Sequence, residues 1–231
     1  MAATLSASRP ALRRNQPKPN VVVFFTDQQR WDTAGLHGNP LDRTPNLDRM
    51  ALRGTHLHNS FTCQPVCGPS RACLQTGLDA TATGCYRNGI PLAPNFRTLA
   101  HYFSAAGYDT GYIGKWHLAD GIQPVPVAQQ GGYEYWLAAN ILEAVSYPYD
   151  TLLFDNHGCP VALPGYRVDG PGFEGGRRLQ ELVSIVDLTP TLLDAAGVHV
   201  PEGLHGRSIM PLVRGQRVAW PSEILIQISE S

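Results

Sequence analysis

The pattern of apolar residues predicts a chain in which β-strands alternate with α-helices. Residues 21–25 form an uninterrupted β-branched and aromatic run, which is typical of a parallel strand buried on both faces. Residues 55–61 predict a second strand and residues 109–113 a third. Asp27 and Gln28 follow the first run directly. They are therefore expected at the carboxyl end of a strand, where open α/β sheets bind their ligands.

Three segments carry the start and stop signals of helices, namely residues 44–54, 98–107 and 187–197. Each opens on Thr or Asp, has apolar residues at helical spacing and ends on Gly. A short polar side chain suits the N-cap and Gly suits the position after the last helical residue. Strands that alternate with such helices indicate an α/β layered fold.

Length and charge exclude several classes of protein. A chain of 231 residues predicts one domain, or one and a fraction. The net charge of −1 and the 16% of charged residues give no electrostatic footprint for nucleic acid or an anionic membrane, and no stretch approaches transmembrane length. Residues 1–19 contain four cations but no apolar core. We expect them to form a disordered tail and not a secretory signal, which predicts a cytoplasmic protein.

Cysteine and histidine side chains are potential metal ligands in this sequence. An odd number of cysteines without a signal peptide predicts reduced thiols, and their spacing fits no zinc pattern. The five are Cys63, Cys67, Cys73, Cys85 and Cys159. His56 and His58 alternate along a predicted strand and could form a metal pair on one face of it. The sequence favours a surface-facing pair instead.

The most informative segment reads CGPSRACLQTG over residues 67–77. Pro69 suits the first turn of a helix, where its missing N–H costs nothing. Cys67 and Gly68 would then lie at the N-cap, where free N–H groups and the helix dipole bind sulfate or phosphate. Arg71, one turn further, can present a planar fork to anion oxygens. The segment therefore predicts a site for a tetrahedral oxyanion, the alternative being an ordinary buried thiol ahead of a helix.

The same segment fits the Cys-x-Pro-Ser-Arg-x-x-Leu-x-Thr-Gly signature, and the chain resembles the sulfatases. The resemblance implies that a formylglycine-generating enzyme converts Cys67 to formylglycine, an aldehyde that becomes the nucleophile. Residues 114–117, Gly-Lys-Trp-His, match the family as well. There the resemblance implies that Lys115 contacts the transferred sulfate and that His117 hydrogen-bonds the formylglycine.

The resemblance also implies a divalent cation, Ca²⁺ first and Mn²⁺ or Mg²⁺ as alternatives. Asp27, Gln28 and the modified Cys67 would hold it, since carboxylate and amide oxygens suit hard cations. Many sulfatases have a second Asp where this chain has Gln28, which is closer to the phosphonate monoester hydrolases of the same superfamily. Sulfate and phosphoryl groups have the same shape, so a sulfate ester hydrolase and a phosphonate or phosphate ester hydrolase both remain open.

The implied fold is α/β and similar to alkaline phosphatase, with a mainly parallel sheet between helices. The implied substrate is a small-molecule sulfate ester or sulfated sugar. Hydrated formylglycine would attack the sulfur, the alcohol would leave, and the second hydroxyl would then expel sulfate. This is covalent catalysis in two steps.

Asp155 and Asn156 superficially match the second half of the family's metal site. Their surroundings, however, resemble a turn between short strands that lies before that motif in relatives. The long apolar strand that normally presents the ligands is also missing ahead of them. The sequence therefore favours a turn, with a metal-ligand role for Asp155 and Asn156 as the alternative.

The resemblance runs through residues 20–169 as the N-terminal part of a sulfatase domain and resumes over 170–231 with a much later part. The junction at Asp169 predicts a large internal deletion that removes the second metal half-site and central strands. The last residues read like the middle of a strand, which predicts a truncated C-terminus. Too few oxygens would then surround the cation, and apolar sheet edges would be exposed. We expect an incomplete sulfatase with impaired activity, the alternative being an inactive remnant.

Overall fold

The structure is a computed structural model, and it describes residues 18–41, 43–147, 150–163, 176–179, 181–223 and 225. Apart from residues 18 and 19, the predicted N-terminal tail lies outside the described residues. So do most of the predicted junction around Asp169 and the final six residues.

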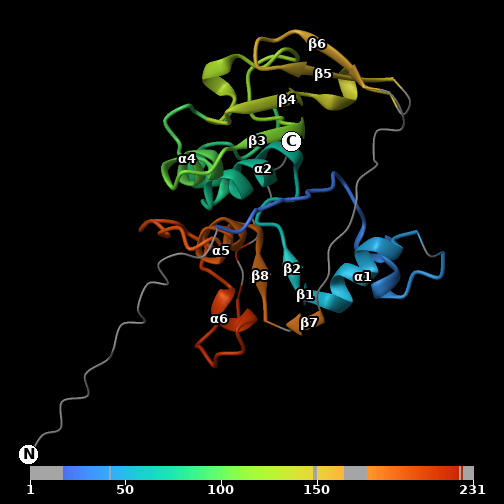
Figure 1. The fold of residues 1–231 in the computed structure, drawn as a ribbon, viewed down its shortest axis with the longest axis vertical. Coiled ribbons are helices and arrows are strands. Elements are labelled where there is room, and N and C mark those ends of the chain that lie inside the picture. Colours follow the sequence, from blue (N-terminus) through green and yellow to red (C-terminus); the bar gives the residue numbers. More distant parts are fainter. Residues whose placement is uncertain are drawn as a thin grey trace, which may run out of the picture.

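The largest sheet has four strands in the order β3-β4-β5-β6 (Figure 1). β3 (Gly111–Lys115) is parallel to β4 (Tyr135–Ala139), whereas β5 (Thr151–Asp155) and β6 (Pro160–Leu163) continue the sheet in antiparallel fashion. The predicted strand at 109–113 thus begins and ends two residues later, which makes Lys115 its last residue.

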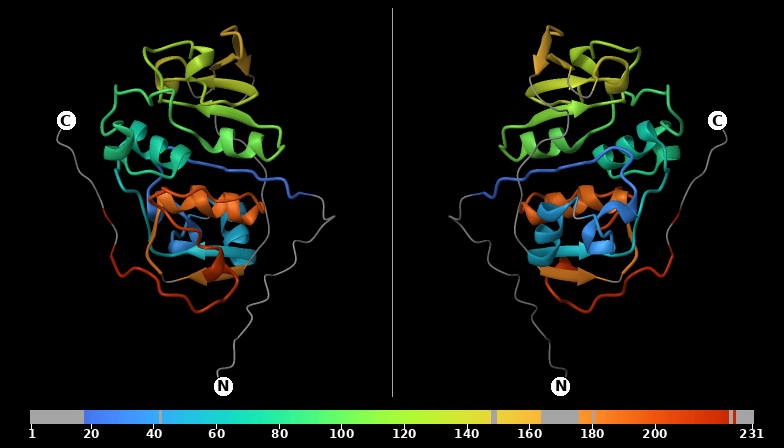
Figure 2. Two further views of the ribbon diagram at one scale, coloured as in Figure 1. Left: turned by 90° about the vertical axis from the view of Figure 1, so that its left-hand side faces the viewer. Right: turned by 90° about the vertical axis from the view of Figure 1, so that its right-hand side faces the viewer.

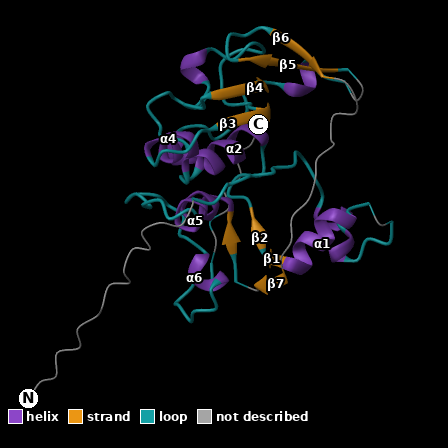
Figure 3. Cartoon of the chain, in the orientation of Figure 1, coloured by secondary structure: helices purple, strands orange, loops and turns teal. Residues whose placement is uncertain are grey.

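Two smaller sheets lie on the other side of α2 (Figures 1 and 3). β1 (Gly54–Leu57) is parallel to β7 (Gly176–Leu179), and β2 (Ser60–Phe61) is parallel to β8 (Val183–Ser184). The single strand predicted over 55–61 is therefore two short strands. Of the strand pairs in the described residues, β1-β7, β2-β8 and β3-β4 are parallel, so the sheets are mainly parallel as predicted, and the β5-β6 hairpin adds the antiparallel pairs.

The helices begin and end close to where the sequence places them. The α-helices are α1 (Pro45–Arg53), α2 (Cys67–Thr76), α3 (Ala80–Thr83), α4 (Leu99–Ala105), α5 (Leu188–Ala195) and α6 (Met210–Val213). The 3₁₀ helices are η1 (Trp31–Thr33), η2 (Gly35–His37), η3 (Val127–Gln129), η4 (Leu142–Ala144) and η5 (Ile185–Asp187). Thr98 forms a capping box with His101 at the start of α4. No helix of the described residues has the length and apolarity that crossing a membrane requires.

Helix α5, which comes late in the chain, packs under the helices of the earlier part. Leu193 of α5 is fully buried in a cluster with Leu99 and Phe103 of α4. The Thr189 hydroxyl donates a hydrogen bond to the Leu74 carbonyl oxygen of α2 at 2.6 Å. Residues on both sides of the predicted junction therefore share one core.

The strand predicted over residues 21–25 is absent, and this expectation was wrong. The segment is extended but pairs with no strand of the described residues. Figures 1 and 2 show it, in blue, running between the four-stranded sheet and the two small sheets. Val22 is 66% exposed and Phe24 72% exposed, and Ile113 on the free edge of β3 is 67% exposed. An apolar run forms a buried strand only when other strands pair with it and cover it, and no strand of the described residues does so here.

The exposure of Phe24 predicts that replacing it has little effect on stability. We expect Phe24→Ala to change the free energy of unfolding by less than about 0.5 kcal/mol, as is usual for exposed positions. The matched change Phe103→Ala, at a residue only 8% exposed, should cost roughly 3–5 kcal/mol. Urea unfolding of both variants measures the difference. A cost above about 2 kcal/mol for Phe24→Ala would contradict the exposed arrangement.

Candidate active site

Cys67 is the first residue of α2, directly after the N-cap residue Val66. The sequence placed the cap one residue later, at Cys67 and Gly68. The Gly68 N–H donates to the Asn88 side-chain oxygen at 2.9 Å. A Cβ at position 68 would lie 3.3 Å from the His117 carbonyl oxygen, so a larger residue would displace this neighbour by a few tenths of an ångström. The start of α2 is thereby held against the residues that follow β3.

The Arg71 side chain is 8% exposed and connects α2 to the end of β3. Its Nη1 donates to the Lys115 carbonyl oxygen at 2.6 Å and to the Tyr112 hydroxyl at 3.4 Å. Its guanidinium lies 5.4 Å from the centre of the Phe25 ring, and its Nη2 lies 3.6 Å from the Asp27 carboxylate. Arg71 therefore joins three segments that are far apart in the sequence.

Lys115 is 5% exposed and lies between two carboxylates. Its ammonium group is 2.9 Å from Asp27 and 2.8 Å from Glu143. Burial alone would lower the pKa of Lys115, but the hydrogen bonds to Glu143 and Asp27 raise it above its usual value. Burial likewise opposes ionisation of Asp27, yet the hydrogen bond from Lys115 and the charges of Lys115 and Arg71 hold its pKa below the usual range. Both groups are thus charged at neutral pH.

His117 has a left-handed backbone, with φ of 58°, and its N–H donates to the Asn140 carbonyl oxygen at 2.8 Å. Burial first, and then the positive charge of Lys115, lower the pKa of His117. Within the described part of the chain, no group hydrogen-bonds its buried Nδ1. A neutral imidazole with a free ring nitrogen is able to accept a proton from a neighbouring group.

A pocket of about 1180 Å³ brings most of these side chains together. Its lining includes Asp27, Gln28, Cys67, Arg71, Lys115 and Glu143. A second pocket of about 650 Å³, towards β2 and β8, shares the first four of these residues, whereas His117 lines neither pocket. Cys67 is half-buried and open to both pockets, whereas Cys63, Cys73 and Cys85 are fully buried. All five cysteines are free thiols, as the sequence predicts.

The oxygen donors in the pocket fit a hard cation in type but are few. Asp27, Gln28 and Glu143 supply carboxylate and amide oxygens, whereas Ca²⁺ takes roughly six to eight oxygen ligands. Lys115 already pairs with both carboxylates. A cation bound here would therefore depend on water or substrate for the rest of its shell and would displace Lys115 from Asp27.

Asp155 and Asn156 are not part of this pocket. The Asp155 carboxylate accepts hydrogen bonds from the N–H groups of His157 and Cys159, both at 2.9 Å. The Asn156 side chain accepts from the Trp136 N–H and donates to the Glu134 carbonyl oxygen, again at 2.9 Å. Both residues shape the β5-β6 hairpin, in agreement with the turn that the sequence favours over a metal-ligand role.

Two residues of the site were not predicted from the sequence. The Asn88 side-chain oxygen accepts a hydrogen bond from the Gly68 N–H, and Glu143 of η4 forms an ion pair with Lys115. Neither belongs to a motif, and each is brought to the site by tertiary structure alone. No pattern in the sequence could have identified them.

The Asp27–Lys115 pair predicts a specific dependence of stability on pH in the metal-free chain. Because the pKa of Asp27 is depressed on folding, its contribution is complete above the unfolded pKa of about 3.9. It is lost as the pH falls through the folded value. The difference in unfolding free energy between the chain and Lys115→Met should therefore shrink between pH 7 and pH 3. Urea unfolding with a chelator present measures it, with Lys18→Met as the matched control, and a constant difference would refute the pairing.

Comparison with known proteins identifies the family. The family model described as Sulfatase matches residues 19–169, and the one described as N-sulphoglucosamine sulphohydrolase, C-terminal, matches residues 168–228. An ulvan-active sulfatase of Formosa agariphila is 40% identical over 124 residues, which cover 52% of this chain and 24% of that protein. The chain thus spans about a quarter of the length of this curated relative.

Solved structures of low sequence identity share the fold. A protein solved in complex with its substrate D-glucosamine-2-N,6-O-disulfate superposes with a TM-score of 0.75 at 15% identity, covering 89% of this chain and 82% of that one. The phosphonate monoester hydrolase of Agrobacterium radiobacter superposes with a TM-score of 0.57 at 15% identity, covering 84% and 77%. The alkaline phosphatase-like fold expected from the sequence is confirmed. Since the Sulfatase model covers more than half of the residues, this chain belongs to the sulfatase family.

Proposed function

We propose that this chain hydrolyses sulfate esters at position 67. The observation that carries the proposal is the placement of Cys67, which starts α2 and opens into a pocket also lined by the cations Arg71 and Lys115. A helix N-terminus with two nearby cations attracts a tetrahedral dianion or monoanion. Membership of the sulfatase family supports the same chemistry.

The nucleophile in this proposal is formylglycine, formed from Cys67 by a formylglycine-generating enzyme. One hydroxyl of its hydrate attacks the sulfur of the ester, and the alcohol leaves. The second hydroxyl then expels sulfate and restores the aldehyde, so that one difficult step becomes two easier ones. The half-buried, pocket-facing position of Cys67 supports this role, because the ester needs access to it.

The surrounding side chains have distinct roles. Arg71 fixes the start of α2 and directs positive charge towards position 67, and Lys115 binds the sulfate oxygens. His117, neutral at pH 7 because its pKa is lowered, takes a proton from the hydrated aldehyde. Lys115 is the residue that must change partners, because in this structure its ammonium group is held by Asp27 and Glu143.

A divalent cation, with Ca²⁺ as the first choice and Mn²⁺ or Mg²⁺ as alternatives, completes the proposal. Asp27 and Gln28 would hold it beside position 67, where such an ion stabilises the charge that develops on the transferred group. The small number of oxygen donors supports weak binding and a reduced rate.

The proposed substrate is a sulfated sugar. The names of the relatives support this class, since one is active on ulvan and another was solved with a disulfated glucosamine. Gln28 is the observation that favours a second candidate, a phosphonate or phosphate ester hydrolase, because it lowers the negative charge around the cation. The incomplete set of oxygen donors favours a third, a sulfatase remnant without turnover.

Co-expression with a formylglycine-generating enzyme tests the proposal. We expect the purified chain to hydrolyse an aryl sulfate faster than an aryl phosphonate, and Cys67→Ala to abolish turnover because the nucleophile is removed. The matched control is Cys159→Ala, at an exposed free thiol outside the pocket, which should keep full activity. Mass spectrometry of the residue at position 67 establishes conversion to the aldehyde.

Each other outcome has a clear meaning. A preference for the phosphonate would replace the proposal with the second candidate. Equal activity of the chain and Cys67→Ala would refute a nucleophile at position 67. Aldehyde-bearing, folded protein without turnover on either ester would show that the chain is a remnant.

Calcium should bind through Asp27. We expect Ca²⁺ at millimolar concentration to raise the melting temperature of the chain, because a ligand that binds only the folded state stabilises it by mass action. Asp27→Asn should remove that rise. Asp32→Asn, at an exposed carboxylate paired with Arg30, should leave it unchanged. Thermal unfolding with and without Ca²⁺ makes the comparison, and an equal rise in both variants would exclude Asp27 as a ligand.

A further inference from the structure

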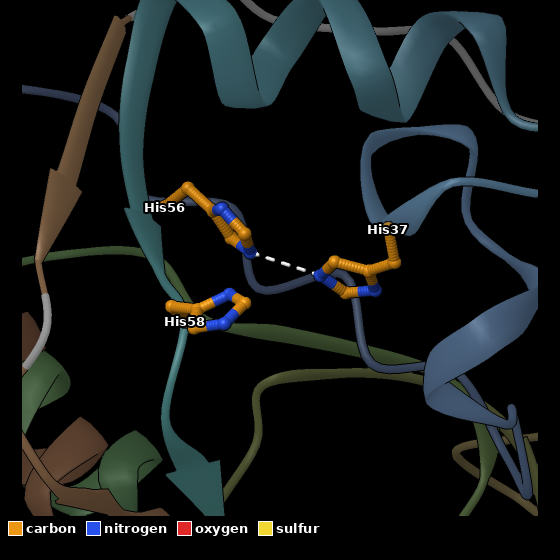
Figure 4. Close-up of side chains that lie close together, drawn as sticks. All are labelled: His37, His56 and His58. Carbon is orange, nitrogen blue, oxygen red and sulfur yellow. Dashed lines mark hydrogen bonds between the residues drawn. The ribbon is translucent and has the colours of Figure 1, made fainter.

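A cluster of three histidines lies outside the pocket that holds Cys67. Figure 4 shows His37 of η2, His56 of β1 and His58, which follows β1, with their rings facing one another. One ring nitrogen from each lies within 4.8 Å of the others, and all three residues are half-buried. None of them lines either pocket of the candidate active site.

The backbone explains why these rings meet. His56 lies in β1 and His58 directly follows it, and their ring centroids are 5.8 Å apart. His37 arrives on a separate turn that is anchored to α1. There the Gly35 N–H donates to the Thr44 hydroxyl at 2.9 Å, and the Leu36 N–H donates to Asp48 at 2.8 Å. The sequence alone showed the pair at 56 and 58, but not the third histidine.

The His37 ring is held in the orientation that a metal ligand needs. Its Nδ1 lies 2.6 Å from the Trp31 carbonyl oxygen, which can only accept, so Nδ1 carries the proton and the lone pair is on Nε2. That Nε2 lies 3.0 Å from Nε2 of His56. The Trp31 ring stacks on the His37 ring, with the two ring centroids 3.9 Å apart and the two planes inclined by 7°. A backbone carbonyl on the second ring nitrogen is the usual support of a metal-binding histidine.

The spacing of His37 and His56 suits zinc, and a ring nitrogen of His58 lies within 4.8 Å of both. Two nitrogens that each lie about 2.0–2.1 Å from a tetrahedral Zn²⁺ are roughly 3.3 Å from one another, close to the 3.0 Å between His37 and His56. Imidazole nitrogens suit Zn²⁺, Cu²⁺ and Ni²⁺ and not the hard cations that carboxylates bind. Among the described residues, no cysteine or carboxylate joins the cluster. Three protein ligands leave a fourth position for water, as in open zinc sites.

We propose that His37, His56 and His58 form a site for a zinc-type transition metal, which links the turn carrying His37 to β1. The site is independent of the proposed sulfatase activity and of the cation at Asp27. The competing explanation is a direct hydrogen bond between the rings of His37 and His56, with no metal. The two differ in whether metal affinity depends on all three residues.

Titration of the chelator-treated full chain with Co²⁺, followed by competition with Zn²⁺, tests the site. We expect one equivalent to bind with the visible bands of a tetrahedral or five-coordinate ion and without a thiolate charge-transfer band. His37→Gln, His56→Gln and His58→Gln should each weaken binding by about 100-fold or more, because loss of even a group that only hydrogen-bonds a metal ligand costs roughly 10–100-fold. His199→Gln, at an exposed histidine elsewhere in the chain, should bind as the unaltered chain does.

A further variant separates metal binding from folding. His56→Cys should still bind one Co²⁺ and should gain a thiolate-to-cobalt charge-transfer band, which a structural role of His56 would not produce. A thiolate band in the unaltered chain would assign the metal to cysteines and overturn the proposal. Affinities that are equal in the chain and all three Gln variants would also overturn it, as would failure to bind one equivalent.

Discussion

The geometry of the candidate active site depends on the burial of two neighbouring cations. Arg71 and Lys115 are both more than nine-tenths excluded from water, and a buried charge costs several kcal/mol unless polar groups compensate it. The Lys115 carbonyl oxygen and the Tyr112 hydroxyl compensate Arg71, while Asp27 and Glu143 compensate Lys115. These contacts fix the start of α2, the end of β3 and the segment at Asp27 relative to one another.

The same constraint bears on the proposed binding of a sulfate ester in the pocket. In the described structure, the carboxylate of Asp27 lies close to both Arg71 and Lys115, and Glu143 pairs with Lys115. Asp27 also belongs to the proposed cation site. Asp27 is shared between Lys115 and any divalent ion, and a cation that takes Asp27 leaves Lys115 with Glu143 alone. The positive charge of Lys115 and the bound cation would then be complementary to the negative charge of an incoming sulfate group. Substrate and cation are therefore expected to bind together more readily than either binds alone.

Local signals in the sequence were sufficient for several helices and for the position of Cys67 at the start of α2. The caps of α4 and the start of α2 depend on residues within one turn of each other, so they could be predicted from sequence. The run at residues 21–25 could not, because a strand requires partners that are distant in the sequence, and its apolar side chains are exposed here. Asn88, Glu143 and His37 escaped prediction for the same reason. Each acts only after the chain has brought separate segments together.

Because α5 packs against α2 away from the main pocket, substitutions near α5 and substitutions near the pocket are expected to have different effects. The residues with proposed catalytic or metal-binding roles all lie between positions 27 and 117, whereas α5 contributes buried contacts, such as that of Thr189 with Leu74, and adds one lining side chain, Leu188, to the second pocket. Variation around α5 therefore changes how much protein is folded, and hence its abundance in a cell. Variation around the pocket changes what each folded molecule does. The two kinds of variant can be distinguished by comparing soluble yield with activity per molecule.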